Sequence, residues 1–193
     1  GFDKNAEVVQ AMLSQGFGFV EAGTVTPKPQ TGNPKPRLFR LTGDGAVINR
    51  LGFNGAGVDV FRENLESVKT RPGPIGVNLG KNADSVDAAA DYTAGVRALA
   101  GLADYLVINV SSPNTPGLRA LQSRDQLSEL LDAVRAELRA EASSDPPPLL
   151  LKVAPDLTDD DKLDIAAVAL EQNLDGLIAT NTTTDKFAFE LTT

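Results

Sequence analysis

Residues 109–119 carry the densest set of groups that could do chemistry. They read Asn-Val-Ser-Ser-Pro-Asn-Thr-Pro-Gly-Leu-Arg and directly follow an apolar run. Their amides and hydroxyls can donate and accept hydrogen bonds without carrying charge, which suits a flat heterocycle with alternating N–H and C=O groups. The same residue types favour turns, so a purely structural turn is the alternative.

Lys152 is unusual because it lies inside the apolar run 149–154. Burying an unpaired ammonium group costs on the order of several kcal/mol, so a lysine in such a run needs a reason. It could stabilise an electron-rich cofactor or form a Schiff base with a carbonyl substrate. The structural alternative is a lysine at the strand end that extends to water.

Asparagines also end other apolar runs. Asn78 ends one run, Asn181 ends another between Thr180 and Thr182, and Asn49 lies at the end of a predicted hairpin. Each is weak evidence alone, but together they predict one shared site.

Three further cations are less decisive. Lys4 lies beside Asp3 and is either an anchor for an anion or part of a surface ion pair. Lys81 and Arg119 are expected to extend into solvent.

Composition excludes several classes of function. The 193 residues carry a net charge of −8, which argues against a nucleic-acid partner. There is no cysteine and no histidine, so a disulfide framework, a thiolate metal site and the usual general base are excluded, and we predict no metal site. Proton transfer must therefore fall to Ser, Thr, Lys, Tyr, a carboxylate or water.

Five short runs are almost continuously apolar, as expected for strands of a parallel sheet with both faces covered. They span residues 18–25, 75–80, 105–111, 149–154 and 176–181. Amphipathic stretches between them predict helices that begin after Asp84, Ser123 and Thr158. Their predicted buried faces are Val86, Ala89, Ala90 and Val96; Leu127, Leu130, Leu131, Val134 and Leu138; and Leu163, Ala166, Ala167 and Leu170.

This alternation predicts an α/β fold with a parallel sheet. No G-x-G-x-x-G fingerprint or P-loop is present, and polar residues follow the ends of several different strands, which favours a (β/α)8 TIM barrel over a doubly wound sheet. The proline-rich residues 27–36 predict an extended loop. Residues 37–41 and 46–50 predict a small β-hairpin over the barrel top. We expect residues 1–193 to form a single domain.

Eight segments resemble dihydroorotate dehydrogenases, in order along essentially the whole chain. They are residues 1–5, 23–27, 34–40, 47–53, 76–82, 109–119, 151–156 and 180–183. The run 109–119 is the most specific. Ser112 matches the position of the catalytic base, which is a serine in the quinone-dependent class 2 and a cysteine in class 1. The hairpin and residues 34–40 also resemble class 2.

The resemblance implies an FMN-dependent oxidation of dihydroorotate to orotate in de novo pyrimidine (UMP) biosynthesis, with quinone as the electron acceptor. Ser112 would take the C5 proton, with Thr115 or a water as relay, while a hydride passes from C6 to flavin N5. Arg40 resembles a residue on the quinone side. The implied substrate contacts are Lys4, Asn49, Arg50, Leu51, Gly52, Phe53, Asn109, Asn114, Asn181 and Thr182. The implied FMN contacts are Gly1, Gly23, Thr24, Asn78, Asn109, Lys152 and Thr180.

The strand count predicts that these residues hold only about strands 2–6 of the barrel. We expect the last strands, and the N-terminal helices by which class 2 enzymes dock on the membrane, to lie outside them. The full-length parent is then expected to be a peripheral membrane protein, while this chain itself has no anchor. The alternatives are a lyase or aldolase with a Schiff base on Lys152, a non-catalytic binding remnant, and another flavin-dependent pyrimidine oxidoreductase.

Overall fold

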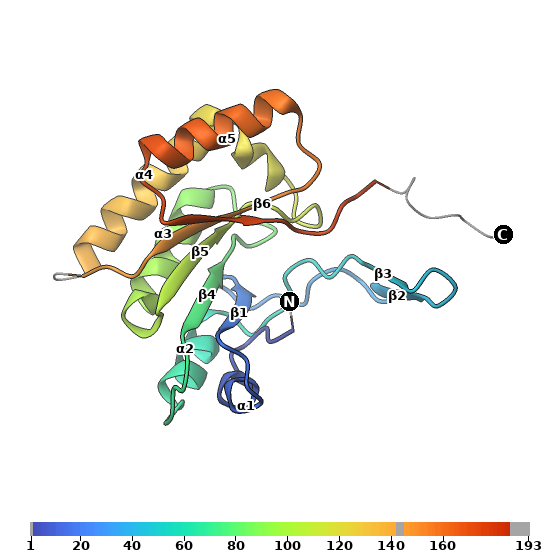
Figure 1. The fold of residues 1–193 in the computed structure, drawn as a ribbon, viewed down its shortest axis with the longest axis vertical. Coiled ribbons are helices and arrows are strands. Elements are labelled where there is room, and N and C mark those ends of the chain that lie inside the picture. The colour runs from blue at the N-terminus through green and yellow to red at the C-terminus, as the bar shows by residue number, and fades with distance from the viewer. Residues whose placement is uncertain (1, 142–144, 186–193) are drawn as a thin grey trace.

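A parallel sheet forms the centre of the computed structural model, which describes residues 2–141 and 145–185. Its strands are β1 (Val20–Val25), β4 (Ile75–Leu79), β5 (Tyr105–Asn109), β6 (Leu149–Val153) and β7 (Gly176–Ala179), in the order β1-β4-β5-β6-β7 (Figure 1). All neighbouring pairs are parallel. Each of the five predicted apolar runs contains one of these strands, so this prediction is confirmed.

Helices connect the parallel strands and cover one face of the sheet (Figure 1). The helices are α1 (Val9–Ser14), α2 (Val58–Glu66), α3 (Ala88–Leu99), α4 (Arg124–Glu141) and α5 (Asp159–Glu171), with short 3-10 helices η1 (Ala100–Leu102) and η2 (Arg119–Gln122). The order β4-α3-β5-α4-β6-α5-β7 is a run of βαβ units. The apolar strand residues and the inner helix faces form one core. No helix in residues 2–141 and 145–185 is long and apolar enough to cross a membrane.

The predicted stripe of α4 is confirmed, because all five of its leucine and valine positions are buried. The predicted face of α5 is wrong: Ile165 and Val168 are buried, whereas Leu163 and Leu170 are 69% and 79% exposed. Two apolar stripes run along this helix. The one that packs inward is set by its contact with α4, which its own periodicity does not specify.

Helix α3 begins later than predicted. Asp87, rather than Asp84, caps it, because the Asp87 side chain accepts the backbone N–H of Ala90 at 2.9 Å. Val86 therefore lies before the helix and is fully exposed, contrary to the prediction. The buried face is Tyr92, Gly95, Val96 and Leu99, so of the predicted set only Val96 is buried.

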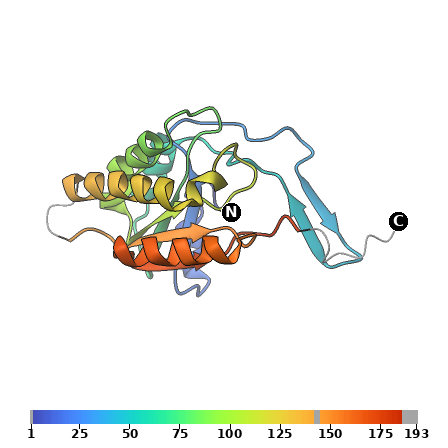
Figure 2. The same ribbon diagram turned by 90° about the horizontal axis from the view of Figure 1, so that it is seen from above.

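The hairpin is confirmed as β2 (Leu38–Leu41) paired with β3 (Ala46–Asn49), and it projects away from the sheet (Figures 1 and 2). Arg50 fastens its base, because its guanidinium donates to the Pro36 carbonyl at 2.9 and 3.2 Å and lies over the Phe39 ring. The loop of residues 27–36 runs back to the sheet, where Asn82 bonds to both the N–H and the carbonyl of Lys28.

Two aspartates close the opposite, N-terminal end of the sheet. Asp104, just before β5, accepts the N–H of Ile75, the first residue of β4, at 2.8 Å and donates its own N–H to the Ile75 carbonyl. Asp175, just before β7, makes the same pair of bonds with Leu149, the first residue of β6. Each aspartate therefore ties the first residue of one strand to its neighbour.

Candidate active site

A polar pocket lies at the C-terminal ends of the parallel strands. The pocket and its open mouth together span about 630 Å³. Its lining is Lys4, Glu21, Gly23, Thr24, Asn49, Leu51, Gly52, Phe53, Asn78, Asn109, Ser112, Asn114, Lys152, Asn181 and Thr182. Strands distant in sequence therefore bring the separate asparagines into one place, as expected.

Every predicted site residue lines this pocket except Gly1, Arg50 and Thr180. Gly1 lies outside the described residues. Arg50 turns away to the Pro36 carbonyl and the Phe39 ring. Thr180 is exposed and donates its hydroxyl to the carbonyl of Asn181.

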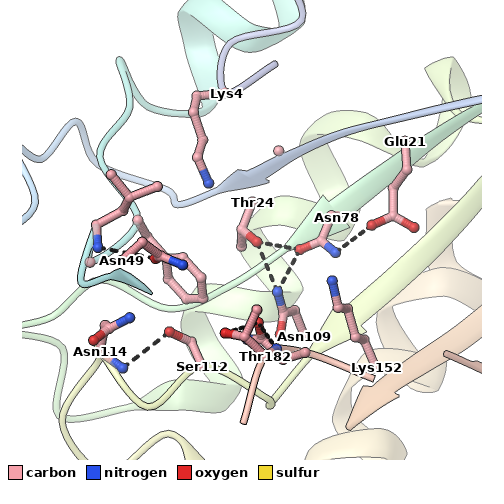
Figure 3. A pocket seen from close by; sticks show the side chains of 15 residues that line it. Lys4, Glu21, Thr24, Asn49, Asn78, Asn109, Ser112, Asn114, Lys152 and Thr182 are labelled. Atoms are coloured by element: carbon pink, nitrogen blue, oxygen red, sulfur yellow. Dashed lines mark hydrogen bonds between the residues drawn. The ribbon is translucent and has the colours of Figure 1, made fainter. Parts of the chain in front are cut away.

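Amide and hydroxyl groups form the inner wall, and their orientation is determined by a hydrogen-bond chain (Figure 3). Asn78 Nδ2 donates to Glu21 Oε1 at 2.8 Å. Asn78 Oδ1 therefore points the other way, where it accepts from Thr24 Oγ1 and, at 3.0 Å, from Asn109 Nδ2. Asn109 Nδ2 also donates to Thr24 Oγ1 at 2.9 Å. Because the Glu21 carboxylate can only accept, it sets the direction of the whole chain.

The chain continues past β5. Asn109 Oδ1 accepts both the N–H and the hydroxyl of Ser111, and Asn181 Nδ2 donates to Ser111 Oγ at 3.1 Å. The buried Tyr92 hydroxyl, on α3, donates to the Asn109 carbonyl at 2.7 Å. The ends of β1, β4, β5 and β7 are thus joined through buried polar groups, which gives a preorganised surface for a ligand.

Glu21 is the pocket residue that the sequence prediction missed. It lies within β1 between Val20 and Ala22, as Lys152 lies within β6. The argument applied to Lys152, that a charge inside an apolar strand needs a reason, would have found it.

Ser112 lies at the pocket with its side chain nearly covered, since the residue is 5% exposed. Its Oγ accepts the backbone N–H of Asn114 at 3.2 Å, which leaves the hydroxyl proton free for a group in the pocket. Nearby in sequence, Thr115 Oγ1 is buried and has no hydrogen-bond partner within the described residues. Two hydroxyls with spare capacity therefore belong to one loop.

Two lysines approach the pocket from opposite sides (Figure 3). Burial lowers the pKa of Lys4, and the charge of Lys152 lowers it further. Asp3 does not pair with Lys4, because its buried carboxylate accepts the backbone N–H groups of Asn5, Glu7 and Val8. This decides between the two interpretations of Lys4: it lines the site, where a negatively charged ligand would relieve the repulsion between the lysines.

The predictions for Lys81 and Arg119 are wrong. Lys81 is 7% exposed, and its Nζ donates to the carbonyls of Asn82 and Ser85. Arg119 forms an ion pair with Asp156 at 2.8 Å. Lys81 turns back onto carbonyls of its own loop, and Arg119 reaches a carboxylate 37 residues away in the loop after β6. Both contacts depend on how the loops fold, which the local sequence does not show.

Gly23 lets the backbone of β1 approach that of β4 closely at the pocket. Its φ is +119°, and a Cβ there would lie 2.6 Å from the carbonyl oxygen of Asn78. A side chain at this position would therefore disturb both the strand pairing and Asn78.

A sequence model of the family described as "Dihydroorotate dehydrogenase" matches residues 1–193. The chain belongs to the dihydroorotate dehydrogenase family. It is 64% identical over 184 residues to a "Dihydroorotate dehydrogenase (quinone)" of Rhodospirillum rubrum and 55% identical over 193 residues to the mitochondrial one of Mus musculus. These alignments cover 95% and 96% of this chain, and 50% and 49% of the relatives. The chain thus spans about half the length of these curated relatives.

The fold agrees with this family. A crystal structure of the dihydroorotate dehydrogenase of Eimeria tenella in complex with ferulenol matches with a TM-score of 0.89 and 51% identity, over 96% of this chain and 56% of that one. The ligand-free structure from the same organism gives the same TM-score and identity. The predicted α/β barrel class is thereby confirmed, with the five described parallel strands as part of it. Family membership favours the predicted flavin oxidoreductase over a Schiff-base aldolase.

Proposed function

We propose that the protein containing these residues oxidises (S)-dihydroorotate to orotate with FMN and passes the electrons to quinone, as a step of de novo pyrimidine synthesis. The observation that carries this proposal is the pocket itself. It gathers one nearly covered serine, two lysines and amides from four strand ends or loops around a single space. The family membership and the names of the relatives support the choice of substrate and acceptor.

FMN fits the chemistry of the pocket wall. Gly23 leaves room beside the strand backbone, and Thr24, Asn78 and Asn109 present uncharged donors and acceptors. Lys152 adds a positive charge, which suits an electron-rich ring system that gains charge on reduction. We assign these residues to the flavin, together with Gly1 and Thr180. When bound, FMN accepts the hydride that leaves the substrate.

We assign Ser112 the removal of the substrate's C5 proton. Its Oγ accepts from Asn114, and its own proton is uncommitted, so it can both take and pass on a proton. A free serine is a weak base and needs a relay. The buried Thr115 hydroxyl, which has no partner within the described residues, is the candidate, directly or through water.

Lys4 is assigned to the carboxylate of the substrate, because a hydrogen bond between an ammonium and a carboxylate is roughly twice as strong as one between neutral groups. Asn49, Asn114, Asn181 and Thr182 then remain to contact the pyrimidine ring through amide and hydroxyl groups. Leu51, Gly52 and Phe53 line the same wall. Arg50, which points to Pro36, would reach a ligand only by turning from its present contacts.

The quinone acceptor implies contact with a membrane, because quinones are apolar and reside there. We propose that residues 1–193 are part of one FMN-binding barrel domain of a peripheral membrane protein, and that other segments make the membrane contact. The hairpin exposes Leu38, Phe39, Val47 and Ile48, and it carries Arg40, which we place toward the quinone side.

The decisive experiment is a visible absorbance spectrum of the purified enzyme, before and after dihydroorotate is added without oxygen. Flavin absorbance that bleaches with substrate would support the proposal. The same bleaching on adding lactate or another simple hydroxy acid, with none on adding dihydroorotate, would refute the substrate. A colourless protein that takes up no FMN would refute the cofactor.

A further inference from the structure

Two segments that carry candidate site residues meet at one carboxylate in a third loop, that of Asp156. This residue lies in the loop after β6. Its Oδ2 accepts from Arg119 Nη1 at 2.8 Å in the loop after β5, and from the N–H and hydroxyl of Thr184 at 3.0 and 3.1 Å in the segment after β7. Its Oδ1 accepts from the Thr183 hydroxyl. The loop after β5 holds Ser112, and the segment after β7 holds Asn181 and Thr182.

Arg119 extends this junction to the residue next to Ser112. Its Nε donates to the carbonyl of Ser111 at 3.1 Å, while its Nη1 binds Asp156. The third nitrogen, Nη2, has no hydrogen-bond partner within the described residues. A single planar guanidinium thus joins the backbone beside Ser112 to a carboxylate that also holds the segment after β7.

Gln122 makes a second link between the segment after β5 and the loop after β6. Its Oε1 accepts the N–H of Ala154 at 2.8 Å, and its Nε2 donates to the Arg119 carbonyl at 3.3 Å. Gln122 is 6% exposed, so this tie is shielded from water. The bond to the Arg119 carbonyl helps to fix the backbone position of Arg119.

The Arg119–Asp156 pair is more shielded than the other ion pairs between helices and loops. The two side chains are 24% and 26% exposed, whereas at least one partner of every other ion pair in the described residues is 45% exposed or more. Exposed ion pairs contribute little to stability, whereas partly buried pairs are screened much less by salt. The Thr183 hydroxyl, together with the bonds from Thr184 and Arg119, lowers the pKa of Asp156 to about 2, so the carboxylate is ionised at neutral pH.

We propose that Arg119 and Asp156 are positioning residues that hold the Ser112 loop in register with the segment carrying Asn181 and Thr182. Neither residue lines the pocket, so they act through the backbone rather than by touching a ligand. Within the part of the chain that the structure describes, the Ser112 side chain has a single hydrogen bond, to its own loop, so its position depends on the loop backbone. This inference rests on the proposed function, in which Ser112 is the base.

The test compares rates of flavin reduction by dihydroorotate, measured anaerobically by stopped flow, with flavin content and melting temperature. For Arg119→Met we expect the limiting rate to fall about 10–100-fold, because small displacements of a reacting group are costly. Flavin content and the half-saturating substrate concentration should change less than about threefold. Arg119→Lys keeps the charge and can make one of the two bonds, so it should recover part of the rate.

A milder variant and a matched control complete the design. Thr183→Val removes one bond to Asp156 and should slow reduction by only a few-fold. Arg97→Met removes the Arg97–Glu137 ion pair between α3 and α4, with bonds of 2.7 and 2.8 Å, and should leave the rate unchanged. The double variant Arg119→Met with Asp156→Asn should be slowed by less than the product of the two single effects, because both changes break the Arg119–Asp156 contact.

The outcomes are separable. If the wild-type enzyme is not reduced by dihydroorotate, the proposed function is wrong and the inference that rests on it goes with it. If dihydroorotate reduces the flavin of the wild type, and reduces that of Arg119→Met and Thr183→Val at the wild-type rate, the function stands and the positioning role is refuted. The positioning role is also refuted if, across all variants including Arg119→Lys, the rate of flavin reduction falls only in proportion to the flavin content or the melting temperature.

Discussion

The two ends of the parallel sheet use polar side chains in opposite ways. At the C-terminal end, Thr24, Asn78 and Asn109 bond mainly to each other and line a pocket. At the N-terminal end, Asp104 and Asp175 bond to backbone N–H groups of the neighbouring strands. A network among side chains leaves polar atoms available to a ligand. Bonds from a side chain to a neighbouring strand's backbone instead fix the register of the two strands. On the proposed function, the first end holds the chemistry and the second holds the fold together, as is common in barrel enzymes.

This comparison is tested by variants at each end, and Ser112→Ala should have the largest effect. Loss of a positioned general base typically costs about 10²–10⁴-fold in rate. The limiting rate of flavin reduction by dihydroorotate should fall by that factor. The melting temperature should change little, because Ser112 Oγ has only one bond among residues 2–141 and 145–185, from the Asn114 N–H. Stopped-flow reduction and thermal denaturation measure the two.

Ser14→Ala is the control for Ser112→Ala. Its hydroxyl likewise makes one local bond, to the carbonyl of Gln10, but Ser14 is an exposed residue at the end of α1. It should leave the rate of reduction unchanged. A Ser112→Ala enzyme that reduces its flavin at the wild-type rate would show that another group takes the proton.

The sequence predicted the sheet well because its signal is local. Short and almost continuously apolar runs are visible in the sequence itself, so the strand positions can be read without knowing what packs against them. The polar residues directly after them follow the same logic, and Asn78, Asn109 and Asn181 do meet in one pocket.

The errors lie where the contacts of a side chain depend on how helices and loops are arranged in the fold. The buried face of α5 depends on α4, so Leu163 was expected inside and Ile165 was overlooked. Lys81 and Arg119 were expected in water because their acceptors lie in loops whose arrangement only the fold determines. The direction of the Arg50 side chain follows from the hairpin geometry for the same reason.

Lys4→Met should have the next largest effect and should act in opposite directions on binding and stability. Hydrogen bonds to a charged group are worth about 1.5–3 kcal/mol, so the half-saturating concentration of dihydroorotate should rise about 10–100-fold. The pKa of Lys4 is lowered by burial and by Lys152, so its charged form opposes folding. Folding should therefore be favoured as the pH rises through that lowered pKa toward 10.5.

In Lys4→Met this cost is absent, so the ligand-free variant should melt no lower than the wild type at neutral pH. The exposed Lys69→Met is the control, and both its binding and its melting temperature should stay the same. An unchanged half-saturating concentration in Lys4→Met would remove Lys4 from the substrate site.

The smallest effect is expected at the N-terminal end, and it should fall on stability alone. Asp104→Ala and Asp175→Ala each leave one strand N–H without its carboxylate acceptor, at 2.8 and 2.7 Å in the wild type. Water can partly replace the acceptor at this open end, so each should lower the free energy of unfolding by about 1 kcal/mol. Chemical denaturation would measure this loss, and the rate of flavin reduction should not change. If these variants slowed reduction while leaving stability intact, the two ends of the sheet would be coupled, and the division between a chemical end and a structural end would be wrong.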